Sequence, residues 1–167
     1  IISRTKPYSL FILWHYTNNR KILKRYKMNE QALKNFFTSN NDAVLSTFRK
    51  NGAAQLSIVT AGYYKGKACF TTTLNRAKFH NIKRNPKCSL LISNSNWSPY
   101  IVIEGTAKIY FTDNTEENAL KHILRDVYRA AAKKEHPNWI EYDQAMKDDM
   151  RAAIIIVPEK IYGTAPS

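Results

Sequence analysis

Turns of hairpin length separate the apolar strands of this chain, and they constrain its fold more than any other feature. Asn51-Gly52 tolerates positive φ and therefore predicts a tight hairpin turn. Ala61-Gly62 and Lys65-Gly66 bracket a second turn. Six strands are predicted, over residues 43–48, 54–60, 67–73, 87–93, 100–111 and 152–157. Strands joined by such short turns pair antiparallel, and an antiparallel meander protects its edges by closing into a barrel.

Helical patterns interrupt the strands at four places. Apolar residues recur at helical spacing over residues 29–38, 75–85, 115–134 and 139–150. Gly105, inside the longest strand, predicts a bend or bulge of the kind that barrels use at corners. The last strand is expected to end before Pro158. We therefore expect an α+β fold, a six-stranded antiparallel β-barrel with flanking helices.

The positive charge of the chain is concentrated near its start. The 167 residues carry a net charge of +13, and residues 1–27 hold seven of the bases and none of the acids. We expect residues 1–27 to be a basic, poorly ordered extension and residues 28–167 to form one domain. The apolar run 8–14 is shorter than the roughly 20 residues that span a bilayer. A signal peptide, a membrane-surface anchor, sequence upstream of a start at Met28 and a nucleic-acid-binding arm are the alternatives for this segment.

Residues that usually carry catalysis are few or scattered. The four histidines lack metal-ligand spacing, and Cys69 and Cys88 form neither a disulfide framework nor a zinc site. The sequence has no glycine-rich phosphate loop and no serine nucleophile elbow. Glu104 is the only acidic residue within the predicted strands. A lone carboxylate of this kind is more often an ion-pair partner than a general acid. We expect no metal site, no catalytic side chain and two buried free thiols in a reducing cytoplasm. Any enzymatic chemistry then needs a cofactor.

One segment has the character of an anion site. A strand ends in three hydroxyls, Thr71, Thr72 and Thr73, and turns directly into a short helix that Asn75 can cap. Arg76 and Lys78 follow in the first helical turn, where cations are unfavourable beside the positive end of the helix dipole. A bound anion would reverse that balance, so the segment predicts a phosphate cradle. A solvated basic helix after an edge strand is the alternative.

Five motifs, in this order and spacing, connect the chain to a known family. They are Ala43–Phe48 with Asn51-Gly52; Gln55–Val59; Phe70–Thr73 with Arg76-Ala77-Lys78, Asn81-Ile82 and Asn85-Pro86; Val102–Gly105; and Pro158–Gly163. Over residues 30–163 the chain resembles the flavin-binding split β-barrels related to pyridoxamine phosphate oxidase. It is most similar to the branch of oxidoreductases that use the deazaflavin coenzyme F-420.

The resemblance implies a homodimeric split barrel with FMN, or alternatively coenzyme F-420, bound at the subunit interface. It places the cofactor phosphate on Thr72, Thr73, Arg76 and Lys78, and the ring along the strand Gln55–Thr60. The implied cofactor-binding residues are Gln55, Ser57, Ile58, Val59, Thr60, Thr71, Thr72, Thr73, Arg76, Lys78 and Trp97. Within this set, Ser57 and Thr60 would touch the ring edge. Trp97, with Tyr100, would close the pocket or pack at an interface.

The function implied by the resemblance is hydride transfer between the cofactor and a small conjugated substrate. Ala77 separates Arg76 from Lys78, whereas the basic pair of pyridoxamine phosphate oxidase is contiguous, and that enzyme's substrate-phosphate residues have no match here. The sequence therefore does not favour pyridoxamine phosphate as substrate. A basic surface at Lys65, Lys67, Lys83, Arg84 and Lys87 would suit the acidic tail of coenzyme F-420. A non-enzymatic module that stores or senses flavin or haem is the alternative, and nucleic-acid binding through residues 1–27 is a third.

Overall fold

The computed structural model describes residues 30–165, so the prediction of a poorly ordered arm at 1–27 lies outside the described residues. The elements are α2 (Glu30–Ser39), β1 (Asp42–Phe48), β2 (Ala54–Thr60), β3 (Gly62–Tyr64), β4 (Lys67–Thr73), α3 (Ala77–Arg84), β5 (Lys87–Ser93), β6 (Tyr100–Tyr110), α4 (Glu117–Ala132), α5 (Trp139–Asp148) and β7 (Arg151–Gly163). None of the helices within this range has both the length and the apolar character needed to cross a bilayer.

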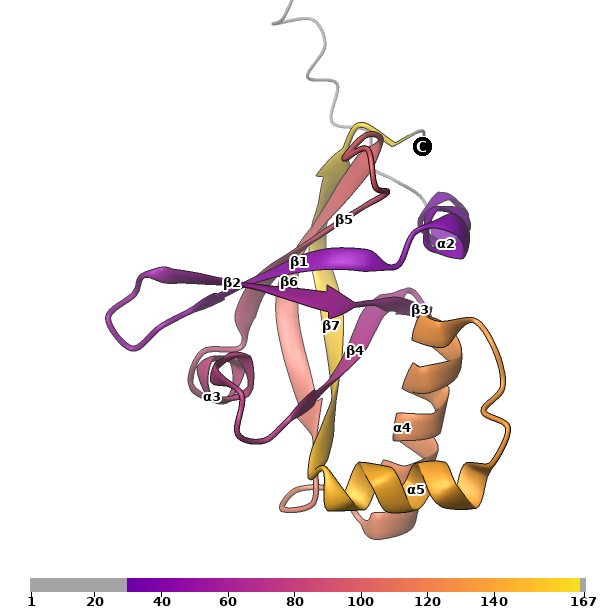
Figure 1. Cartoon of the computed structure of the whole chain (residues 1–167). Helices are drawn as coiled ribbons and strands as arrows, with labels where there is room; N and C mark the ends of the chain where they lie inside the picture. Colours follow the sequence, from indigo (N-terminus) through magenta and orange to yellow (C-terminus); the bar gives the residue numbers. More distant parts are fainter. Residues whose placement is uncertain (1–29, 166–167) are drawn as a thin grey trace, which may run out of the picture.

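The strands form one antiparallel sheet in the order β2-β1-β5-β6-β7-β4-β3. The sheet curls, and its two edge strands, β2 and β3, are joined by Ala61 alone (Figure 1). Helices flank this curled sheet, which confirms the α+β class. The described sheet has seven strands where six were predicted. The additional strand, β3, is only three residues long and lies in the segment that was expected to be a turn.

The long strands β6 and β7 pair across an irregularity at Gly105, as the sequence predicted. The register shifts between Glu104 and Gly105, because Glu104 pairs with Lys160 and Gly105 pairs with Pro158. A β-carbon on Gly105 would lie 2.2 Å from the carbonyl oxygen of Val157, so only glycine fits there. The expectation that Pro158 ends the last strand was wrong, since β7 continues to Gly163. Proline is tolerated at a bulge, where the ladder is already disrupted.

Two apolar clusters lie on opposite faces of the curled sheet. The interior cluster includes Leu45, Phe70 and Ile103, and α2 packs against it through Leu33 and Phe37. The second cluster lies between the sheet and the two C-terminal helices, where Cys69 and Ile155 meet residues of α4 and α5. Figure 1 shows α4 and α5 together at one side of the sheet and α3 at the other. The outer surface of β4 and β7 is therefore covered by α4 and α5.

The outward face of β2 is apolar and exposed. Leu56 is 67% exposed and Ile58 is 83% exposed. The strand register places Ile58 beside Val44 of β1. The same row continues through Leu91, Val102 and Tyr162 on β5, β6 and β7. We call Leu56 together with this row the apolar row; it runs across five strands of the sheet.

Candidate functional site

The predicted phosphate cradle lies where β4 leads into α3. The N-cap of α3 is Arg76, and its side chain makes no capping hydrogen bond, so the prediction that Asn75 caps this helix was wrong. The side-chain oxygen of Asn75 instead accepts a hydrogen bond from the Thr73 hydroxyl, at 2.6 Å. The Arg76 amide donates to the Thr73 carbonyl at 3.2 Å. Thr73 therefore stabilises the turn through these two hydrogen bonds, and the N-cap residue of α3 makes no side-chain hydrogen bond to the helix.

The cations of this cradle are not neutralised within the described part of the chain. The first turn of α3 contains no acid. Neither Arg76 nor Lys78 has an ion-pair partner among residues 30–165. Partial burial, and then repulsion from Arg76, lower the pKa of Lys78 below its ordinary value. An anion beside both side chains would relieve this repulsion and satisfy the first amides of the helix.

Asn81 fixes α3 against the β1–β2 hairpin. Its side chain is 5% exposed. The amide nitrogen donates to the Thr47 hydroxyl and to the Gln55 side-chain oxygen, both at 3.1 Å. Its oxygen accepts from Arg84 at 2.8 Å, and Arg84 also donates to the carbonyl of Phe48. Asn81 therefore holds the helix that carries Arg76 and Lys78 at a fixed position relative to β2.

The predicted ring-binding strand, β2, presents its residues on two faces. Val59 is buried in the interior cluster, and Gln55 bonds to Asn81, so both point away from the outer surface. Ser57 has the same parity along the strand as these two. Ile58 and Thr60 are exposed on the other face. Since β2 pairs only with β1 in the described sheet, its other edge offers backbone groups to a ligand.

A cavity of about 420 Å³ opens between the sheet and the two C-terminal helices. Two predicted site residues, Thr60 and Thr71, belong to its lining, together with Arg151. Arg151 pairs with Thr73 in the β4–β7 ladder, next to the cradle. Sequence reasoning did not select Arg151, because only the register of two strands far apart in the chain brings it there.

The sequence matches the family model described as pyridoxamine 5'-phosphate oxidase over residues 30–165. The chain belongs to this family. Among solved structures, a conserved hypothetical protein of Mycobacterium tuberculosis has 19% identity and a TM-score of 0.68, over 85% of this chain and 88% of the other. An F420 reductase has 20% identity and a TM-score of 0.50, over 73% and 89% of the two chains. A heme-binding protein of Mycobacterium smegmatis has 16% identity and a TM-score of 0.58, over 81% and 53%. These likenesses show the split-barrel fold.

In this member of the pyridoxamine 5'-phosphate oxidase family, one chain brings only part of the predicted set together. Thr73, Arg76 and Lys78 lie at the cradle, and Thr71 faces the cavity. Thr72 is 4% exposed and, by strand alternation, lies on the opposite face of β4 from Thr71 and Thr73. Trp97 is 63% exposed in the loop after β5. That loop lies at the end of β5 away from α3, so Trp97 is remote from the cradle of its own chain (Figure 1).

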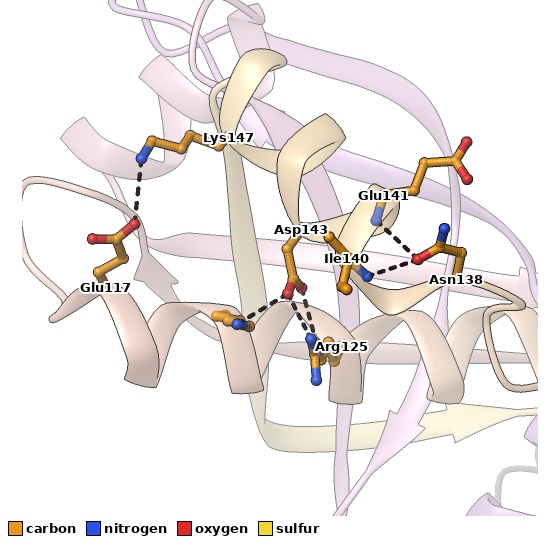
Figure 2. A network of polar contacts seen from close by, with 8 residues as sticks. Glu117, Arg125, Asn138, Ile140, Glu141, Asp143 and Lys147 are labelled. Atoms are coloured by element: carbon orange, nitrogen blue, oxygen red, sulfur yellow. Dashed lines mark hydrogen bonds and ion pairs between the residues drawn. The ribbon is translucent and has the colours of Figure 1, made fainter.

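The helices that wall the cavity are tied to each other by polar contacts. Figure 2 shows Asp143 of α5 accepting hydrogen bonds from Arg125 of α4, and Lys147 paired with Glu117. The Asn138 side chain caps α5 by accepting from the amides of Ile140 and Glu141. The Arg125 guanidinium holds the pKa of Asp143 below its usual range. These contacts hold α5 in position over α4 and so maintain the cavity.

The described residues contain no cluster of His, Cys, Asp and Glu that could hold a metal ion. Cys69 and Cys88 are free and buried, as predicted, and burial raises the pKa of both thiols to about 12. Neither is therefore a nucleophile at neutral pH. Glu104 pairs with Lys160 at 3.5 Å and accepts a hydrogen bond from Tyr162, which confirms its assignment as an ion-pair partner.

Proposed function

We propose that the protein is an oxidoreductase that uses FMN or coenzyme F-420 to transfer hydride to or from a small conjugated substrate. One observation carries this proposal: two cations, Arg76 and Lys78, lie together at an uncapped helix start beside Thr73, without an acid. Family membership and the likeness to an F420 reductase support the same class of cofactor.

The residues of the cradle fit the phosphate of such a cofactor. Arg76 and Lys78 would bind it through charge-assisted hydrogen bonds, and the first amides of α3 would add donors. Thr73 would donate its hydroxyl to the phosphate by giving up its hydrogen bond to Asn75. The free edge of β2 would lie along the ring. The flavin or deazaflavin supplies hydride chemistry when bound. The protein would supply position and electrostatics.

We further propose that the protein acts as a homodimer through the apolar row. Exposed side chains as large as Leu56 and Ile58, continuous with apolar residues on four more strands, are typical of an interaction surface. A dimer would also give Trp97 a route to the cofactor, from the partner chain. Both cysteines are free, which supports a reducing compartment, the cytoplasm.

The deciding experiment is a titration of the full chain with FMN, coenzyme F-420 and riboflavin, followed by fluorescence. Replacing both Arg76 and Lys78 by alanine should weaken the affinity for the phosphorylated cofactor by at least about tenfold, because two charge-assisted contacts are lost. Riboflavin lacks the phosphate, so its affinity should not change.

The matched control replaces Arg49 and Lys50, two exposed cations at the β1–β2 turn, by alanine. This variant removes the same charge and should bind the cofactor normally. Equal losses in both double variants would overturn the cradle. Tight haem binding, detected as a Soret band, with no affinity for either flavin would favour the storage module instead.

A further inference from the structure

We infer that the cavity between α4, α5 and the sheet binds a flat, largely apolar substrate through one carboxylate, and that Arg151 is the residue that holds this carboxylate. This inference rests on the proposed function and names the class of its substrate. The lining of the cavity includes Thr60, the last residue of the strand along which the cofactor ring is proposed to lie. A molecule in the cavity would therefore lie next to the end of that strand.

The walls of the cavity are apolar and partly aromatic. Its lining includes Val127, Tyr128 and Ala131 of α4, and Tyr142, Ala145 and Met146 of α5. Tyr128 and Tyr142 pack edge to face with ring centroids 5.0 Å apart. A volume of about 420 Å³ is within the range of small-molecule sites. Small side chains on both helices leave the space, so a planar ring system fits this surface better than a sugar or a peptide.

Arg151 is the only arginine or lysine of this lining, within the part of the chain that the structure describes, and His136 is the other basic side chain there. Its guanidinium uses Nε and one terminal nitrogen to bind Asp149, at 3.2 and 3.1 Å. Because a guanidinium has five N–H donors, it can bind a second carboxylate at the same time. The Asp149 carboxylate is 52% exposed, so this ion pair is weak and readily shared.

The charge balance of the cavity distinguishes a carboxylate from a phosphate. A phosphate monoester carries a charge of roughly −1.5 to −2 at neutral pH. The cradle offers two cations and no acid in its helical turn, whereas the cavity offers Arg151 and also contains Glu141. Arg151 is also paired with Asp149 outside the lining, so its one shared guanidinium suits a monoanion and is too little charge for a phosphate. The two sites thus divide the anions, with phosphate at the cradle and carboxylate at Arg151.

The test measures benzoate and benzamide binding to the full chain by calorimetry, before any cofactor is added. Benzoate should bind the wild type at least about tenfold more tightly than benzamide, its uncharged counterpart. Arg151→Gln should abolish this preference. Asp149→Asn should strengthen benzoate binding, because it removes the competing carboxylate. Arg49→Gln loses the same charge on the surface and should behave as wild type.

A benzoate preference that survives in Arg151→Gln, or no benzoate binding at all, would overturn the inference. Cofactor affinity of Arg151→Gln, measured separately, should equal that of wild type. If it falls as far as in the Arg76 and Lys78 double variant, then Arg151 belongs to the cradle and the inference is wrong. Normal benzoate selectivity in a chain that binds no cofactor would overturn the proposed function alone.

Discussion

Lys78 and Arg76 repel each other in the free protein, and this repulsion predicts how cofactor binding depends on pH. The pKa of Lys78 is lowered from 10.5, by burial first and by Arg76 second. Between the lowered value and 10.5 the unfolded chain holds more protons than the folded one, so stability rises with pH in that window. Phosphate binding has the opposite sign, because it requires the protonated amine.

We therefore expect the affinity for FMN, divided by the affinity for riboflavin, to fall as the pH rises through the lowered pKa of Lys78. Fluorescence titrations across the alkaline range measure this ratio, in which ionisation of the shared ring cancels. Lys78→Arg should bind FMN with a constant ratio, since a guanidinium stays charged throughout this range. A ratio that declines equally in Lys78→Arg would show that Lys78 does not contact the phosphate.

At this scale the sequence predicted the chemistry of the cradle better than its geometry. Charge and position along the helix identified Arg76 and Lys78 as an unfavourable pair. That Asn75 does not cap the helix could not be predicted, because the Thr73 hydroxyl binds the side-chain oxygen that would have formed the cap. Thr72 and Thr71 look equivalent in sequence, and only the face of β4 that meets the core separates them. Arg151 depended on strand register, which one sequence does not encode locally.

At the scale of elements, β3 and α4 approach each other closely behind the wall of the cavity. A β-carbon added to Gly62 would lie 2.3 Å from the carbonyl carbon of Ala130, so α4 packs directly on the backbone of β3. The helix cannot yield without moving the residues that line the cavity, because Ala131 follows Ala130 in the same turn. Gly62 is required here by close approach.

Gly62→Ala should therefore destabilise the fold by about 3 kcal/mol, as overpacking against backbone does. Gly52→Ala is the comparison, because Gly52 has a φ of +83° and an added β-carbon there would meet no neighbouring atom. The only cost at this position is to hold an alanine at positive φ, which is about 1–2 kcal/mol. Urea unfolding of the two variants measures the difference, and an equal loss in both would show that the β3–α4 contact is looser than described.

Element boundaries were predicted well where hydrophobic periodicity is strong, and poorly for a short strand between two turn signals and for a strand that continues through a proline. The strands from β4 to β6 agree with prediction to within a residue. By contrast, β3 was not predicted, because it lies between the turn signals Ala61-Gly62 and Lys65-Gly66. The strand β7 extends past Pro158, because the bulge there removes the cost of the missing backbone N–H. The β7 error comes from pairing with β6, a partner distant in sequence that overrides a local turn signal. The β3 error has a local origin, because this three-residue strand pairs with the adjacent β4 in a short hairpin.

For the whole molecule, the apolar row predicts the state of assembly. Ile58→Lys should weaken self-association by at least about tenfold, because it places a charge on the most exposed side chain of a surface that the dimer would bury. Ile140→Lys is a matched control, since Ile140 is 82% exposed, like Ile58 at 83%, but lies on α5 away from the row. Sedimentation equilibrium measures both variants. A monomeric wild type, or the same weakening in both variants, would contradict the proposed dimer.

Ala61 alone connects the strand proposed to lie along the ring with the β3–β4 hairpin that leads to the cradle. The span across one residue is about 7 Å and is set by covalent geometry. Neither strand can slide past the other to suit a longer or shorter molecule, so this linkage fixes the distance between the two regions that would bind the cofactor. Two cofactors with the same structure between ring and phosphate would fit this distance equally well. The protein would then distinguish them only through the part of the cofactor that extends beyond the phosphate into solvent.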